Sequence, residues 1–213
     1  MSKKTNEINK ILKIKNNYDA PKRLWQVLKN RSEREQVFKE MLELFDYRLD
    51  IDWLGDYYQE TLADKKDQGQ VFSPPHTTQL MSQLLGIENC SPVVEKGIIL
   101  EPCSGTGRMS ISYWNVARKT NDYKPEDYRF ICEELSEQLI PFLVFNLAIR
   151  GINAVVVHCN TVTRKSFGAF LISNKENNPN HFSIINRVAY DEHSEKILGV
   201  KFTTKLYPAH EEL

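Results

Sequence analysis

The chain has 213 residues, of which 41% are hydrophobic, enough for the core of one sizeable domain with or without a small appendage. Lysine and arginine number 28, as do aspartate and glutamate, so the total charge neither indicates nor excludes a polyanionic partner. The sequence has no apolar run long enough to cross a bilayer, and its start lacks the apolar core of a signal peptide. The four cysteines form no Cys-x-x-Cys pair, so we expect reduced thiols in a cytoplasmic protein without membrane contact.

Charge is unevenly distributed near the start of the chain. Residues 1–34 hold ten basic and three acidic side chains, whereas residues 35–70 hold four basic and ten acidic ones. A basic leading arm can contact the phosphates of a nucleic acid. Because only Tyr18 and Trp25 accompany the basic residues, we favour a solvated tail over a nucleic-acid contact.

Residues 5–62 show helical periodicity. Ser32, with Glu35 three residues later, predicts a capping box at the start of a helix. That helix carries an apolar stripe formed by Val37, Phe38, Met41, Leu42, Phe45 and Leu49. We therefore predict a small helical domain over residues 1–67, followed by a second domain over residues 68–213.

The most informative stretch is residues 97–109, where an apolar run is followed by Glu101, Pro102 and the turn Ser-Gly-Thr-Gly. The run at 98–100 predicts a central parallel strand buried on both faces, and residues 109–116 predict a helix. This order brings backbone N–H groups and a helix N-terminus to the carboxyl end of a strand, where α/β sheets bind ligands. The glycines match neither a dinucleotide fingerprint nor a phosphate loop. A carboxylate beside the turn suits a ligand with an ammonium or hydroxyl group, so we favour a nucleotide-like ligand or S-adenosylmethionine over a plain connection.

Two further strands are predicted, at residues 128–133 and 154–158, with a helix between them that begins near Ile140. The first of these strands ends in adjacent carboxylates, Glu133 and Glu134. Neighbouring side chains of a strand point to opposite faces, so only one of the two can reach a ligand. A carboxylate in this position can accept hydrogen bonds from both hydroxyls of a ribose.

Several segments resemble the N-6 DNA methylase family, the adenine-specific DNA methyltransferases that include the modification subunits of type I restriction systems. Residues 101–107 (Glu-Pro-Cys-Ser-Gly-Thr-Gly) are similar to the family's cofactor motif, Asp/Asn/Glu-Pro-x-x-Gly-Ser/Thr-Gly. The other matching segments follow the family's order: 70–75 (Gln-Val-Phe-Ser-Pro-Pro), 130–135 (Phe-Ile-Cys-Glu-Glu-Leu), 146–152 (Asn-Leu-Ala-Ile-Arg-Gly-Ile) and 158–162 (His-Cys-Asn-Thr-Val). Together they cover about residues 68–165.

The resemblance implies a Rossmann-like S-adenosylmethionine-dependent methyltransferase fold, with S-adenosylmethionine as cofactor, DNA as substrate, and specificity or modification subunits as partners. The offset from Asn146 selects Glu134 over Glu133 as the ribose-binding acid. Asn160 stands where the family usually has the Asp that accepts from the cofactor's adenine, and an Asn carbonyl oxygen can still accept. The implied cofactor-binding residues are Phe72, Ser73, Pro74, Glu101, Pro102, Ser104, Gly105, Thr106, Gly107, Glu134 and Asn160. No histidine has a partner at ligand spacing, so no metal site is predicted.

The resemblance is incomplete after the fourth strand, which is predicted at residues 167–172. Family members carry Asn/Asp-Pro-Pro-aromatic there, and this tetrapeptide binds the target amine and stacks on the flipped base. Asn174 has the expected position and is the candidate catalytic residue. Lys175, Glu176 and Asn177, however, replace the two prolines and the aromatic residue, and no other such tetrapeptide occurs in the chain.

The end of the chain predicts a β-hairpin formed by residues 181–190 and 197–206, so we expect a shortened, mostly parallel sheet with a C-terminal hairpin. Two functions stay open. The chain is either an adenine-specific DNA methyltransferase whose partners supply sequence recognition, or a catalytically inactive, truncated cofactor-binding accessory or regulatory module. The family resemblance favours the first function, and the altered tetrapeptide favours the second.

Overall fold

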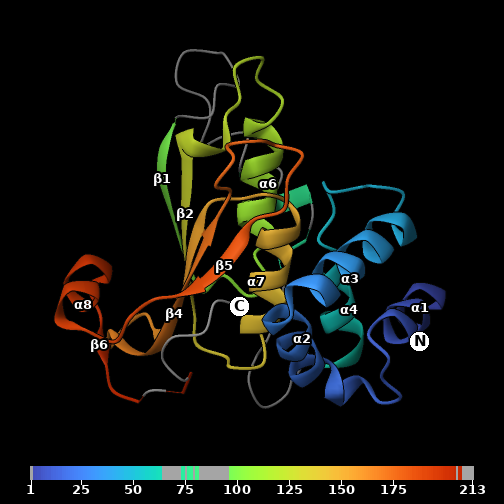
Figure 1. The fold of residues 1–213 in the computed structure, drawn as a ribbon, viewed down its shortest axis with the longest axis horizontal. Coiled ribbons are helices and arrows are strands. Elements are labelled where there is room, and N and C mark those ends of the chain that lie inside the picture. Colours follow the sequence, from blue (N-terminus) through green and yellow to red (C-terminus); the bar gives the residue numbers. More distant parts are fainter. Residues whose placement is uncertain are drawn as a thin grey trace.

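The computed structural model describes residues 2–63, 73–74, 76–78, 80–81, 96–204 and 206–207. Within these residues a mixed sheet carries two helices on one face, on which further helices pack, and one short helix near the C-terminal end of the chain lies on the other side (Figure 1). This is the α/β, Rossmann-like architecture that the sequence predicts. No helix in the described part of the chain combines the length and the apolar character that crossing a membrane requires.

The N-terminal part forms a helical layer, which we define as α1 Lys3–Ile11, α2 Ala20–Lys29, α3 Arg31–Leu44 and α4 Trp53–Thr61, with a short 3₁₀ helix, η1 Asn17–Asp19. The basic start of the chain belongs to this layer and is not a solvated tail, because Ile8 and Leu12 are buried where α1 packs on α3. The predicted cap at Ser32 is wrong. The side chain of Asn30 caps α3 by accepting from the backbone N–H of Glu33 at 3.0 Å.

The sheet contains the strands β1 Gly97–Pro102, β2 Tyr128–Glu134, β3 Ala154–Asn160, β4 Lys165–Ser173, β5 Ile184–Arg187 and β6 Lys201–Phe202. Their order is β1-β2-β3-β4-β5, and β6 also pairs with β4. β1, β2 and β3 are parallel, whereas β4 runs antiparallel to β3. The carboxyl ends of the first three strands therefore share one edge of the sheet, and β4 ends at the opposite edge.

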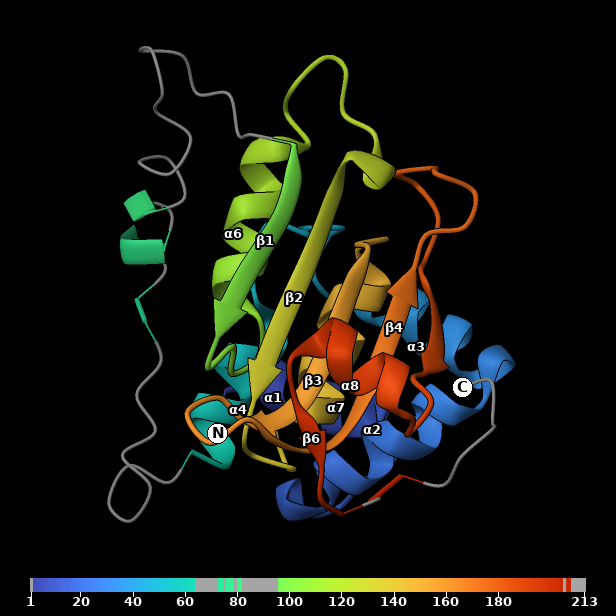
Figure 2. The same cartoon turned by 90° about the vertical axis from the view of Figure 1, so that its left-hand side faces the viewer.

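Two crossover helices, α6 Arg108–Ala117 and α7 Ile140–Ile149, connect the parallel strands and lie on the same face of the sheet (Figure 2). A short 3₁₀ helix, η2 Pro125–Asp127, precedes β2. Every residue of α7 is buried, because this helix lies between the sheet and the helical layer. One hydrophobic cluster includes residues of the helical layer, α7 and the sheet. The predicted domain boundary at residues 67 and 68 lies outside the described residues, and the two predicted domains share this core.

β1 does not occupy the central, doubly buried position that its apolar run predicts. Among the described strands it pairs only with β2. Ile99 packs against the core beneath α6, but Ile98 and Leu100 point to the other face and are 70% and 59% exposed. Within the described part of the chain, the sheet extends from β1 to one side and the crossover helices lie on one face, so Ile98 and Leu100 are left exposed.

The predicted C-terminal hairpin is also wrong. β5 and β6 do not pair with each other: both pair with β4, β5 antiparallel and β6 parallel. Between them the chain forms α8 Glu192–Leu198 instead of a loop. The side chain of Asp191 accepts from the backbone N–H of Ser194 at 2.7 Å, and Gly199 ends the helix with a φ of 62°.

Candidate functional site

The glycine turn, which we define as residues 103–107, joins the carboxyl end of β1 to the N-terminus of α6. Cys103, Gly105 and Gly107 have φ values of 60°, 59° and 89°. At Gly107 an added Cβ would lie 2.8 Å from Leu143 Cδ1, so both the backbone conformation and the packing require glycine there. The turn is thus a tight backbone structure pressed against α7.

The polar side chains of the glycine turn point into the protein. Ser104 is buried, and its Oγ donates to the backbone oxygen of Glu101 at 2.6 Å. Thr106 is fully buried, and its Oγ1 donates to Asp52 Oδ2 at 2.6 Å. The outer surface of the turn is therefore formed by exposed Cys103 and half-buried Gly105.

Glu134 lies against the glycine turn. Its Oε2 accepts from the backbone N–H of Gly105 at 2.8 Å, and its Oε1 accepts from the backbone N–H of Ser136 at 2.7 Å. An ionised carboxylate has about four acceptor positions, so about two are left for the hydroxyls of a ligand. Glu133 points to the other face of the sheet, where its Oε2 accepts from Arg164 Nη1 at 2.8 Å.

Glu101 faces α6 and not the outer side of the turn. Its Oε2 accepts from the backbone N–H of Ser110 at 2.9 Å and from Ser110 Oγ. Burial raises the pKa of Glu101 to about 7, although both hydrogen bonds from Ser110 act to lower it. The carboxyl group thus accepts hydrogen bonds from the first turn of α6, and its burial disfavours the charged form.

The ends of β1 and β3 complete this edge of the sheet. Pro102 is exposed at the end of β1. At the end of β3, Asn160 Oδ1 accepts from the backbone N–H groups of Val162 and Thr163 at 3.0 and 2.9 Å. Both lone pairs of that oxygen therefore accept from the backbone, and the expected contact of Asn160 with adenine stays a prediction. Its side-chain N–H groups are left to meet a ligand.

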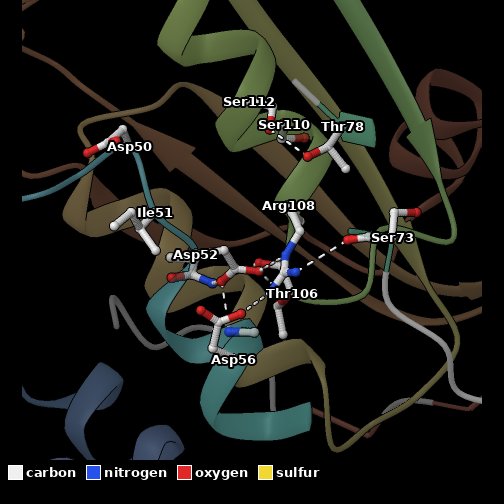
Figure 3. Close-up of polar contacts among 12 residues, drawn as sticks. Asp50, Ile51, Asp52, Asp56, Ser73, Thr78, Thr106, Arg108, Ser110 and Ser112 are labelled. Carbon is white, nitrogen blue, oxygen red and sulfur yellow. Dashed lines mark hydrogen bonds and ion pairs between the residues drawn. The ribbon is translucent and has the colours of Figure 1, made fainter. Parts of the chain in front are cut away.

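Of the segment predicted to lie near the cofactor, Phe72 falls outside the described residues. Ser73 and Pro74 are exposed. The backbone oxygen of Ser73 accepts from Arg108 Nη1 at 3.3 Å, which places this segment beside the N-terminus of α6 (Figure 3).

Asn174 lies at the opposite edge of the sheet. Because β4 is antiparallel to β3, Ile172 pairs with Ala154 at the amino end of β3, and β3 is roughly 20 Å long at ~3.3 Å per residue. Asn174 is buried there, and its Nδ2 donates to the backbone oxygen of Asn178 at 2.7 Å. The structure does not bring Asn174 together with the glycine turn, and its contacts are those of a loop-stabilising residue.

A buried carboxylate that no sequence motif indicated lies behind the glycine turn. Asp52 directly precedes α4 and is 5% exposed. It accepts from Thr106 of the turn and Arg108 of α6 (Figure 3). It also accepts from Asn146 of α7. One signal was present in the sequence, because Asn146 is the single polar residue of α7, and buried polar side chains require partners.

A cavity of about 240 Å³ opens between the start of α4 and the flank of α6. Its polar lining includes Asp50, Asp56, Asn115 and Lys119, and it shares Asp52 and Arg108 with the network just described. Gly105, Glu134 and Asn160 do not line it. Among the residues that the structure describes, no three His, Cys, Asp or Glu side chains are grouped as a metal site.

Comparison with known proteins shows the family to which the chain is related. Residues 49–201, more than half of the chain, match the family described as N-6 DNA Methylase. The type II restriction enzyme and methyltransferase RM.BcgI of Heyndrickxia coagulans is 29% identical over 121 residues, which are 53% of this chain and 18% of that protein. The type I restriction enzyme MjaVII methylase subunit of Methanocaldococcus jannaschii is 27% identical over 161 residues, 70% of this chain and 26% of that protein. No solved structure was found to match.

This chain therefore spans about a quarter or less of the length of these curated relatives. The family match begins at residue 49, inside the helical layer, so it includes Asp52 as well as the glycine turn and the first three strands. The chain belongs to the N-6 DNA methylase family.

Proposed function

We propose that this chain binds S-adenosylmethionine at the carboxyl ends of β1, β2 and β3, as the cofactor-binding part of a restriction–modification system that methylates adenine in DNA. The observation that carries the proposal is the position of the Glu134 carboxylate, which lies 2.8 Å from the backbone nitrogen of Gly105. The names of the two relatives, a restriction enzyme and methyltransferase and a methylase subunit, support the wider context.

The residues at this edge fit an adenosyl group. Glu134 keeps acceptor positions for the two ribose hydroxyls, and Gly105 has no side chain to hold a ligand away from the backbone. The side-chain N–H groups of Asn160 suit a ring nitrogen of adenine. S-adenosylmethionine supplies an activated methyl group on its sulfonium, and the role of these residues is to hold and orient the adenosyl part.

The proposal does not extend to methyl transfer by this chain alone. The tetrapeptide that binds the target amine in the family is absent from the sequence, and Asn174 lies at the other edge of the sheet. The described residues thus offer no counterpart of the amine-binding group near the glycine turn. We propose that DNA and the specificity or modification subunits are the partners with which this chain works.

Titration calorimetry with S-adenosylmethionine tests the cofactor site. We expect saturable binding that Glu134→Gln weakens by about tenfold or more, because hydrogen bonds to a charged acceptor are replaced by weaker neutral ones. Glu133→Gln is the matched control: the same change one residue earlier, on the other face of the sheet, is expected to leave the Kd within about threefold. Absence of binding by the unmodified chain, or equal weakening by both variants, would contradict the proposal.

Transfer of a radiolabelled methyl group tests the division of labour. We expect no incorporation into duplex DNA when this chain is incubated with labelled S-adenosylmethionine alone. Incorporation into adenine by the purified chain would instead show that it carries a complete catalytic site, and the proposed dependence on partners would be wrong.

A further inference from the structure

We infer that Asp52 is a positioning residue of the cofactor site. From the helical layer, Asp52 holds the glycine turn in place through its hydrogen bonds with Thr106 and Asn146. This inference rests on the proposed function, because it assigns to Asp52 an effect on the affinity for S-adenosylmethionine. It also makes the helical layer a part of the site and not only a cover for the sheet.

The first step is the convergence of donors on one carboxylate. Asp52 Oδ1 accepts from the backbone N–H of Gly55 and from Asn146 Nδ2, each at 2.8 Å. Its Oδ2 accepts from Thr106 Oγ1 at 2.6 Å and from Arg108 Nε at 3.3 Å. The four donors come from α4, α7, the glycine turn and α6, so this single side chain joins four elements.

The second step is the way in which the glycine turn is held from two sides. On its outer side, the backbone N–H of Gly105 donates to Glu134. On its inner side, the next residue is fixed twice: Thr106 Oγ1 donates to Asp52, and the Thr106 backbone oxygen accepts from Asn146 Nδ2 at 2.8 Å. The Gly105 N–H belongs to the peptide group between Ser104 and Gly105, and Thr106 directly follows Gly105, so a shift of Thr106 acts on that N–H through the backbone of a single residue.

The third step is the rigidity of the segment that carries Asp52. The fully buried guanidinium of Arg150 donates to the backbone oxygens of Leu49 and Ile51 at 2.8 and 2.6 Å. Its Nη1 also donates to Asn146 Oδ1 at 3.1 Å, so Arg150 fixes both Asp52's own segment and one of its donors. Asp52 is therefore held in place before any ligand binds.

The fourth step is the close approach of α4 to the glycine turn. A Cβ added to Gly55 would lie 2.0 Å from Asp52 Oδ2 and 2.7 Å from Thr106 Oγ1, so the backbone of α4 approaches the turn closely. Arg108 offsets the buried charge and also donates to Asp56 Oδ1 at 2.6 Å. A buried carboxylate is stable only with such partners, so a change at Asp52 alters the contacts of the turn.

A purely structural role makes a different prediction. Asp52 caps α4 through the N–H of Gly55, and loss of a cap lowers the stability of a protein without changing how its folded form binds a ligand. Asp191 provides the matched control, because it caps α8 in the same way, through the N–H of Ser194. The ligand affinity of the folded protein separates the two roles.

The experiment measures the Kd for S-adenosylmethionine in Asp52→Asn, Thr106→Val, the double variant and Asp191→Asn. Both single changes are expected to weaken binding by about tenfold or more, since each removes a hydrogen bond to a charged group that sets the turn. The double variant is expected to bind no more weakly than the weaker single variant, because both changes remove the same contact. Asp191→Asn is expected to bind as the unmodified chain does.

A second measurement needs no ligand. We expect the amide hydrogen of Gly105 to exchange with solvent at least about tenfold faster in Thr106→Val than in the unmodified chain, because the turn loses its inner contact. Thr106→Val keeps the Asp52 cap of α4, so it carries the test if Asp52→Asn does not fold. An unchanged Kd and unchanged exchange in a folded variant would overturn the inference and leave the proposed function standing. Failure of the unmodified chain to bind S-adenosylmethionine, with faster exchange in Thr106→Val, would overturn the proposed function. The inference that the contact between Asp52 and Thr106 holds the glycine turn would then still stand.

Discussion

Three carboxylates surround the glycine turn, and each meets a different set of donors. Glu134 faces the N–H of Gly105, Glu101 faces Ser110 at the start of α6, and Asp52 faces Thr106 from behind. The donors that a carboxylate meets determine what it can do. Of the three, Glu134 is the one that keeps acceptor positions at the outer side of the turn, whereas Glu101 and Asp52 hold the turn and the helix that follows it.

Replacement of Glu101 by Gln is expected to make stability less dependent on pH. The pKa of Glu101 is raised in the folded protein to about 7, so the folded state holds this proton more tightly than the unfolded state does. This contribution to stability is full below the unfolded pKa of about 4.5 and is lost as the pH rises to about 7, by up to ~3 kcal/mol at 1.36 kcal/mol per unit. Urea unfolding from pH 5 to pH 8 should show Glu101→Gln gaining stability relative to the unmodified chain as the pH rises. Parallel curves would contradict the prediction.

At the scale of single residues, the sequence predicted which carboxylate lies against the glycine turn but could not predict the one behind it. The alternation of a strand separated Glu133 from Glu134, and the structure places the chosen one against the turn. Asp52 could not be found in this way, because its partners Thr106 and Asn146 lie 54 and 94 positions away. Only the packing of the helical layer on α7 brings these side chains together.

At the scale of elements, β4 separates the two candidate regions. The strand returns antiparallel to β3, so it carries its own carboxyl end away from the glycine turn. At that end Asn174 Oδ1 accepts from the backbone N–H of Asn178 at 3.1 Å, and its Nδ2 donates to the backbone oxygen of Gly151 at 3.1 Å. Asn174 thereby joins the loop after β4 to the loop after α7.

Replacement of Asn174 by Ala is therefore expected to act on stability alone. We expect a loss of about 1–3 kcal/mol in the free energy of unfolding, because buried backbone groups lose their partner. The Kd for S-adenosylmethionine should stay unchanged in the folded variant. Asn160→Ala, the same change at the other edge of the sheet, is expected to weaken binding. A weaker Kd in Asn174→Ala would place that residue in the cofactor site after all.

The sequence predicted where most elements begin and end, but not how the later ones pair. The predicted start of α7 near Ile140 and its end before Gly151 are confirmed, because proline and glycine act locally. The direction of β4 depends on pairing with β3, which no local pattern encodes. For α8 a local signal existed, since Asp191 and Gly199 are a suitable cap and terminator, but the predicted hairpin places residues 191–196 in its loop.

At the scale of the whole molecule, the helical layer and the sheet share one core. Trp25 of α2 lies with its ring 5.1 Å from that of Phe170 in β4, and Phe38 of α3 lies edge to face with Phe145 of α7 at 4.7 Å. The two predicted domains are therefore not independent in their packing. Their shared core also explains how Asp52 reaches the glycine turn.

We expect this shared core to make unfolding a single transition. The fluorescence of Trp25 reports on the helical layer and that of Trp114 on α6. The variants Trp25→Phe and Trp114→Phe therefore retain tryptophan residues in different parts of the molecule. In each variant, the urea midpoint from tryptophan fluorescence should coincide with the midpoint from far-ultraviolet circular dichroism. Two separated transitions, with the helical layer unfolding first, would contradict the prediction.

The order of the described strands, which all lie on one side of β1, has a consequence for access to the glycine turn. From β1 the described strands succeed one another to one side only, so nowhere among them does the strand order reverse. In doubly wound sheets the ligand crevice opens at such a reversal, between loops that lead to opposite faces. The described strands form one wall of such a crevice. No described strand lies beyond β1, where Ile98 and Leu100 are exposed. Among the described strands, those beside a molecule seated on the glycine turn therefore all lie on the side of β2 and β3.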